Sequence, residues 1–160
     1  MHRKGHIGAS LVVYAPFGFA LAALASIEAG AIVAAAVAST AMIPDLDISV
    51  PFVKHRGITH TVWFALFIGL LLAGVVAVLP LEEVGVSHFV LVPLFFVVGT
   101  LAILGHLLGD IITPQGLHPF APVTDSHYSL ALCNAKNPVA NYSFLTLGII
   151  SVCTFLILVA

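Results

Sequence analysis

Two polar side chains inside an otherwise apolar stretch, His106 and Asp110, have the spacing of a paired metal ligand. They are four residues apart, so in a helix they lie on one face, one turn from each other. Side chains at this spacing can bind the same metal ion. Gly105 and Gly109 flank them with the same spacing, and we expect these glycines to let a second helix approach closely.

Further candidate ligands lie in two short segments near the middle of the chain. Asp45 and Asp47 follow Pro44, which is expected to stop the preceding helix. Residues 55–60 read HRGITH, so two imidazoles and one guanidinium surround a glycine. Thr59 is expected to cap the helix that follows, and the N-terminus of that helix would favour an anion.

Composition defines the setting in which these side chains must be held. The chain has 160 residues, of which 61% are hydrophobic and only 8% charged, and its mean hydropathy is +1.17. Such a composition indicates an integral membrane protein and excludes a disordered chain. With five Lys and Arg residues in total, a nucleic-acid-binding surface is not expected.

Five apolar segments are candidate membrane spans, although the second is short for one. They predict a single all-α domain over residues 1–160, a helical membrane bundle with about five transmembrane helices. The expected spans are residues 7–26, 29–43, 59–79, 86–112 and 142–160.

An alternating path through five helices places every basic residue on one side of the membrane. These residues are Arg3, Lys4, Lys54, Arg56 and Lys136. The opposite turns hold Glu28, Glu82 and Glu83. Since basic residues favour the cytoplasmic side, we predict a multi-pass protein of the inner or plasma membrane, with the N-terminus inside and the C-terminus outside.

The same path brings the remaining ionisable groups to the cytoplasmic end, because odd helices start there and even helices finish there. The converging residues are His6, Asp45, Asp47, His55, His60, His106 and Asp110. Ionisable groups at membrane depth are costly and usually functional, so the sequence predicts a metal site. Imidazole and carboxylate without thiolate suit zinc, manganese, iron or nickel.

The number of candidate ligands bears on how many ions the site holds. Seven exceed the four ligands of one tetrahedral zinc, so some support the ligands from outside, or more than one ion is bound. A clustered site of this kind could form a metal-bound hydroxide nucleophile and polarise an ester at once. Neither cysteine, Cys133 or Cys153, belongs to a CxxC pair, which excludes a cysteine-based zinc site.

At these motifs the chain resembles the YdjM-type inner-membrane metal-dependent hydrolases. The motifs that carry the resemblance are HIG at 6–8, PDLD at 44–47, HRGITH at 55–60, GHLLGD at 105–110, TPQG at 113–116 and PF at 119–120. Together they extend over roughly three quarters of the chain. The resemblance implies a hydrolase that depends on a divalent metal, most simply zinc, and more than one ion is allowed.

A more distant resemblance connects that family with zinc-dependent phospholipase C and the single-strand-specific zinc nucleases, which hydrolyse phosphoesters. By this analogy the direct metal ligands are His6, Asp45, His60, His106 and Asp110. Asp110 would be the bridging carboxylate.

Catalytic roles are expected for Asp47, His55 and Arg56. Asp47 and His55 belong to the motifs of the membrane family, and the planar guanidinium of Arg56 suits a phosphate. The expected partners are the lipid bilayer and a phosphoester substrate, with a phospholipid as one candidate.

Several alternatives remain open from the sequence. A metal-ion transporter or metal-sensing membrane module could use the same ligands, although a transporter should carry polar groups through the midplane. A structural membrane subunit would leave the convergence of ligands unexplained. Residues 1–25 could instead form a cleaved signal peptide ending in Ala23-Leu24-Ala25. His118 could be an additional ligand or a solvated loop residue, and His127 is expected to be solvated.

Overall fold

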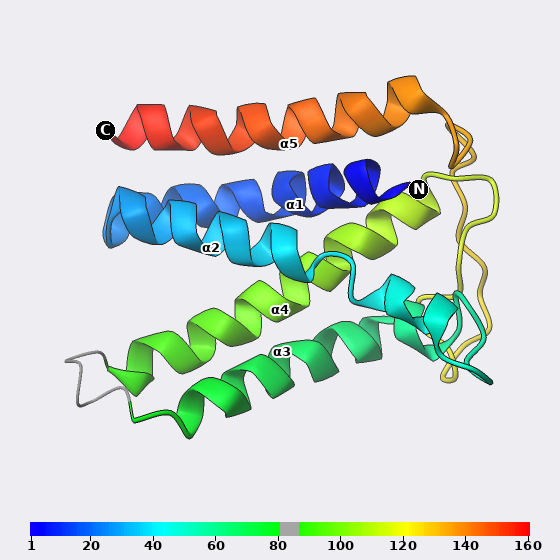
Figure 1. The fold of residues 1–160 in the computed structure, drawn as a ribbon, viewed down its shortest axis with the longest axis horizontal. Coiled ribbons are helices and arrows are strands. Elements are labelled where there is room, and N and C mark those ends of the chain that lie inside the picture. Colours follow the sequence, from blue (N-terminus) through cyan, green and yellow to red (C-terminus); the bar gives the residue numbers. More distant parts are fainter. Residues whose placement is uncertain (81–86) are drawn as a thin grey trace.

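The computed structural model describes residues 1–80 and 87–160 and contains five α-helices that run in alternating directions (Figure 1). They are α1 (Arg3–Leu24), α2 (Ile27–Thr40), α3 (Val62–Ala77), α4 (His88–Ile111) and α5 (Pro138–Val159). Two 3-10 helices, η1 (Pro44–Ser49) and η2 (Ile58–His60), lie between α2 and α3. The described residues form no strand, which confirms the all-α prediction.

Helix α1 lies inside the bundle, where it packs against α2, α4 and α5, while α3 packs against α4 at the far edge (Figure 1). Close approach of the backbones requires glycine at the contacts. A Cβ atom on Gly8 would lie 2.2 Å from the backbone of Phe144 in α5, and one on Gly105 would lie 2.3 Å from the Cα atom of Ser10 in α1. The packing role expected for Gly105 therefore follows from the contact between α4 and α1.

Four helical segments are long and apolar enough to cross a membrane: α1, α2 continued through η1, α4 and α5. Helix α3 has only 16 residues, about 24 Å at 1.5 Å per residue. This is less than the hydrocarbon thickness of about 30 Å. The span expected over residues 59–79 is thus too long at both ends, because α3 begins only after η2 and ends at Ala77.

Two expected helix boundaries were wrong for identifiable reasons. Helix α2 ends at Thr40, not Ile43, because the ring of Pro44 would clash with the carbonyl group four residues earlier, that of Thr40. The cap of α3 is Thr61, whose hydroxyl accepts a hydrogen bond from the backbone N–H of Phe64 at 3.2 Å. Thr59 lies in η2 instead and bonds elsewhere.

The helices begin and end at two opposite ends of the bundle (Figure 1). One end of the bundle holds the start of α1, both 3-10 helices, the end of α4 and the connection from 112 to 137. This connection is irregular apart from a bridge between Leu117 and Tyr128. Helix α5 starts at Pro138, capped by the side chain of Asn137, four residues earlier than expected.

The helices alternate in direction, as assumed from the sequence, and the two chain ends lie at opposite ends of the bundle (Figure 1). Glu82 and Glu83, expected on the side opposite the basic residues, lie outside the described residues, as does the expected start of the fourth helix at position 86. The side of the membrane on which each end lies stays a prediction.

Candidate metal centre

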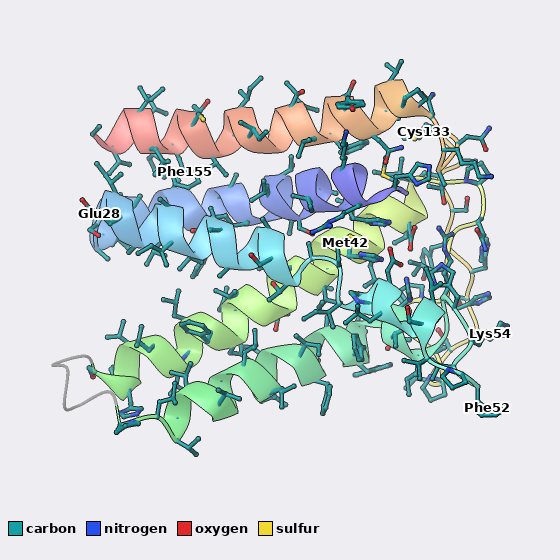
Figure 2. The ribbon with its side chains drawn as sticks, in the orientation of Figure 1. Glu28, Met42, Phe52, Lys54, Cys133 and Phe155 are labelled. Carbon is teal, nitrogen blue, oxygen red and sulfur yellow. The ribbon has the colours of Figure 1, made fainter. Side chains whose placement is uncertain are left out.

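The candidate ligands gather at the end of the bundle that holds η1 and η2. Helix α1 supplies His6, η1 supplies Asp45, η2 supplies His60, and α4 supplies His106 and Asp110. Figure 2 shows this end, with Lys54 and Phe52 at its outer edge and Glu28 at the far end of the bundle. All of these ligands except Asp45 are at most 1% exposed, so the chain buries three imidazoles and a carboxylate together.

The distances between ligand atoms have the size of the edges of a metal coordination tetrahedron. The Nε2 atoms of His60 and His106 are 3.3 Å apart. Oδ1 of Asp45 lies 3.4 Å from the first and 3.3 Å from the second. Oδ2 of Asp110 lies 3.5 and 3.7 Å from the same two atoms. Metal–ligand bonds of about 2.0–2.1 Å in a tetrahedral zinc site separate the ligands by about 3.3–3.4 Å.

Three overlapping groups of ligand atoms could each hold an ion. They are His6 with Asp45 and His106, Asp45 with His55 and His60, and His60 with His106 and Asp110. The overlap is compatible with more than one ion. Asp45 belongs to two of the groups and Asp110 to one, so the shared carboxylate in this geometry is Asp45, whereas the distant resemblance implied Asp110.

Hydrogen bonds at Nδ1 set the orientation of the buried imidazoles. Nδ1–H of His106 donates to the carbonyl oxygen of Ala41 at 2.8 Å, and Nδ1–H of His6 donates to the carbonyl oxygen of His106 at 3.2 Å. The His6 and His106 rings stack in parallel with centroids 3.7 Å apart. Since a carbonyl group can only accept, each ring keeps its Nε2 lone pair for a cation, as in histidines that ligate metals.

Asp47 performs the same task for two other histidines. Its Oδ1 accepts a hydrogen bond from Nδ1 of His55 at 2.8 Å, and its Oδ2 lies 3.4 Å from Nδ1 of His60. The hydroxyl of Thr59 donates to the same Oδ2 at 2.5 Å. Asp47 is 3% exposed and faces the Nδ1 edges of both rings, so the structure places it behind the ligands. His55 is the open member of the set, with its side chain 38% exposed.

Arg56 is bonded to the protein rather than open to solvent. Its guanidinium donates to Oδ1 of Asp110 at 2.5 Å and to the carbonyl oxygen of Gly116 at 2.9 Å. Its backbone φ of 61° lies in the left-handed region, which is costly for a residue other than glycine and is often found at functional sites. Its Nε–H is buried and has no partner among the described residues.

The two oxygens of Asp110 differ in a way that points to a cation. Oδ1 accepts from Arg56 and from the amino group of Met1, which lies 2.8 Å away. Oδ2 is buried with no hydrogen-bond partner among the described residues. An unpartnered buried carboxylate oxygen is costly, and it faces the two Nε2 atoms of His60 and His106. The donor set therefore fits a divalent metal ion.

The sequence analysis missed several groups that support the ligands. One is the carbonyl group of Ala41, which becomes available because α2 ends there. Another is Thr113, which donates to the backbone carbonyl of Asp110 at 2.8 Å. Gly109 leaves room for His6, since a Cβ atom added at position 109 would lie 2.9 Å from Nδ1 of His6. Thr113 carries a sequence signal because it opens the TPQG motif, and Gly109 was expected to allow close packing but not to make room for a ligand; the carbonyl group of Ala41 carries no signal.

His118 and His127 lie together on the connection after α4, outside the three ligand groups. Nδ1 of His118 is 3.2 Å from Oδ1 of Asp125, and Nε2 of His127 is 3.0 Å from the carbonyl oxygen of Gln115. The two rings are 5.0 Å apart. In this structure the loop does not bring His118 into the centre.

Comparison with known proteins gives one family. The family model described as YdjM inner membrane protein matches residues 1–160. No curated protein matches the chain, and no solved structure does. The chain therefore belongs to the YdjM inner membrane protein family, as its motifs suggest.

Proposed function

We propose that this member of the YdjM inner membrane protein family is a membrane-embedded, metal-dependent hydrolase of phosphoesters. The observation that carries the proposal is the orientation of the buried imidazoles. The Nδ1 atoms of His6, His60 and His106 face oxygen atoms, while Nε2 of each lies within 3.7 Å of a carboxylate of the centre. Arrangements of this kind are typical of metal ligands.

The ligands for one ion would be His60, His106, Asp45 and Asp110. His6 adjoins this set through Asp45 and His106 and would serve a second ion. Zinc is the metal we propose, because imidazole and carboxylate ligands at these separations suit it. A bound divalent ion would supply an activated water and would polarise the phosphoryl group, whose phosphorus the water attacks as the bond to the leaving group breaks.

The remaining residues of the site would handle the substrate and its protons. The unpartnered Nε–H of Arg56 is the group we propose for a phosphoryl oxygen, while its other nitrogens hold Asp110 and the loop at Gly116. His55 is exposed and hydrogen-bonded to Asp47 through Nδ1. Such a pair can exchange a proton at Nε2 with water or a leaving group.

The distribution of polar groups supports a hydrolase over a transporter. The buried histidine and aspartate side chains that the structure describes, His6, Asp47, His60, His106 and Asp110, all lie at one end of the bundle. The interior beyond them is an apolar cluster that includes Val37, Ala102 and Phe155. A transporter should carry polar binding groups to the membrane midplane.

Metal analysis combined with hydrolysis assays tests the proposal. We expect the purified protein to contain zinc and to hydrolyse at least one phosphodiester, phosphomonoester or phospholipid in a panel of such substrates. Asp110→Asn keeps the size of the side chain but removes its charge. Loss of a group that only supports a ligand lowers metal affinity about 10–100-fold. Asp110→Asn should lower metal affinity by more than this, and activity should fall in parallel.

His88→Ala provides the control, because His88 bonds to the carbonyl oxygen of Leu79 at the opposite end of the bundle. It should leave metal content and activity unchanged. If the wild-type protein contains metal but hydrolyses none of the substrate classes, the hydrolase proposal is contradicted. Full metal occupancy in folded Asp110→Asn would remove Asp110 from the ligand set.

A further inference from the structure

A second polar feature at the same end of the bundle is a basic pocket between the start of α1 and the start of α5. Its volume is about 460 Å³. Its lining residues are His2, Arg3, Lys4, Lys136, Pro138, Asn141 and Tyr142. Three of the five Lys and Arg residues of the chain are thus in one pocket, and the pocket contains no carboxylate. Its electrostatic potential favours an anion.

The walls of the pocket are held by specific contacts. The amine of Lys4 donates to the hydroxyl of Tyr142 and lies 4.1 Å from the centre of its ring. The side chain of Asn141 is 3% exposed. Its oxygen accepts from the backbone N–H of His2 at 2.9 Å, and its nitrogen donates to the carbonyl oxygen of Ala135 at 2.9 Å. These bonds tie the first residues of the chain to α5 and to the loop before it.

No carboxylate among the described residues neutralises the positive charge of the pocket. Lys4 is bonded to a neutral hydroxyl, and no ion pair between Arg3 or Lys136 and a carboxylate occurs among residues 1–80 and 87–160. Both α1 and α5 are long enough to cross the membrane, so the pocket lies where two spans begin. Basic pockets between helices at this depth are suited to phosphate-bearing head groups.

A groove continues from the pocket along α5. It has a volume of about 510 Å³ and is lined by Val139, Tyr142, Ser143, Thr146 and Leu147. The spacing of three, four and seven residues from Val139 corresponds to one helical face. Tyr142 lines both spaces. The basic pocket and the groove therefore adjoin at Tyr142, and the groove extends along a membrane-spanning helix.

From this continuity we propose that the pocket and groove form a binding site for an anionic phospholipid. The phosphate group lies among Arg3, Lys4 and Lys136, and one acyl chain lies along α5 against Thr146 and Leu147. The lining residues include none of the metal-centre ligands. The lipid is thus bound beside the metal centre, and its binding requires neither a metal ion nor turnover.

Native mass spectrometry of the protein in a mild detergent tests the site, with phosphatidylglycerol, phosphatidylcholine and glycerol phosphate as probes. Phosphatidylglycerol should be retained in preference to phosphatidylcholine, and glycerol phosphate, which has no acyl chain, should bind much more weakly. Lys4→Gln and Lys136→Gln should each lower the affinity for phosphatidylglycerol about fivefold. Lys54→Gln removes a charge at the same end but outside the pocket and should have no effect.

A second variant tests the groove without a change of charge. Thr146→Phe fills the space beside Tyr142. It should weaken the binding of phosphatidylglycerol and leave the binding of glycerol phosphate unchanged. Equal binding of both lipids, or equal losses in Lys54→Gln and Lys136→Gln, would overturn the site. Full competition by glycerol phosphate would show a free-anion site instead of a lipid site. Unchanged metal content in all variants separates this result from the fate of the proposed hydrolase.

Discussion

Among single residues, Asp47 has the most consequential position after the ligands themselves. It contacts Nδ1 of both His55 and His60 and receives the hydroxyl of Thr59. One buried carboxylate thus orients two imidazoles of the 55–60 segment. It bonds directly to His55, and it acts on His60 together with the hydroxyl of Thr59, which lies 3.0 Å from Nδ1 of His60. Asp47 was assigned to catalysis from the sequence, and its geometry indicates a positioning residue.

We predict that Asp47→Asn weakens metal binding without abolishing it. An amide can still accept hydrogen bonds at its oxygen, but its nitrogen cannot accept one and it carries no negative charge, so it cannot orient both rings as the carboxylate does. The affinity for zinc, measured by competition with a chelating dye, should fall about 10–100-fold, and excess zinc should restore occupancy. If the variant remains apo at saturating zinc, Asp47 would itself be a ligand.

At the scale of the helices, the glycines of α4 have separate tasks that substitution can distinguish. At Gly105 an added Cβ would meet the backbone of α1, and at Gly109 it would press on the His6 ring and touch the Met1 side chain at an ordinary contact distance. Gly105→Ala should therefore destabilise the bundle by about 1–3 kcal/mol through overpacking, seen as a lower melting temperature in detergent. Gly109→Ala should melt near the wild-type temperature but bind zinc about tenfold more weakly.

Gly74 supplies the matched control for both variants, since an added Cβ there meets nothing within 4 Å. Gly74→Ala should change neither melting nor metal affinity. A Gly109→Ala protein with wild-type zinc affinity would mean that His6 can shift without cost, and His6 would then not be a ligand.

The elements also show which parts of the fold a sequence can reveal. Apolar length and proline positions predicted five helices and their order, because these depend on local composition. The exact ends of the helices could not be predicted from local composition. Helix α2 ends before Ile43 since Pro44 acts on the carbonyl four residues earlier, and Thr61 rather than Thr59 caps α3 because Thr59 is engaged by Asp47. Such tertiary contacts leave no periodic signal.

For the whole molecule, the alternating path was sufficient to gather the ligands, whereas their individual contacts were not predictable. The path fixes that His6, His60 and His106 share one end, since it depends only on the number of crossings. The bond from His106 to the carbonyl of Ala41 and the position of Arg56 against Asp110 depend on how α4 and the 3-10 helices are rotated. Sequence spacing does not specify that rotation.

The orientation in the membrane is a prediction that belongs to this scale. Every Lys and Arg residue is expected at the end that holds the metal centre, so that end should face the cytoplasm. A reporter fused after Lys136 should be active as a cytoplasmic protein, and one fused after Ala160 as an exported protein. The reverse pattern would place the metal centre on the outer side while leaving its geometry intact.

The short α3 and the bonds around η1 and η2 have a consequence for the dynamics of the protein. The segment from Ala41 to Thr61 is joined to the rest of the chain at the centre, where Ala41, Asp45 and His60 contact His106 or Asp110. Arg56 adds bonds to Asp110 and Gly116. The local unfolding of this segment should thus be controlled by zinc. When a chelator removes the zinc, amide hydrogen exchange should accelerate in this segment well before it does in α1 and α4. The occupied centre thus holds in place the long connection between α2 and α3.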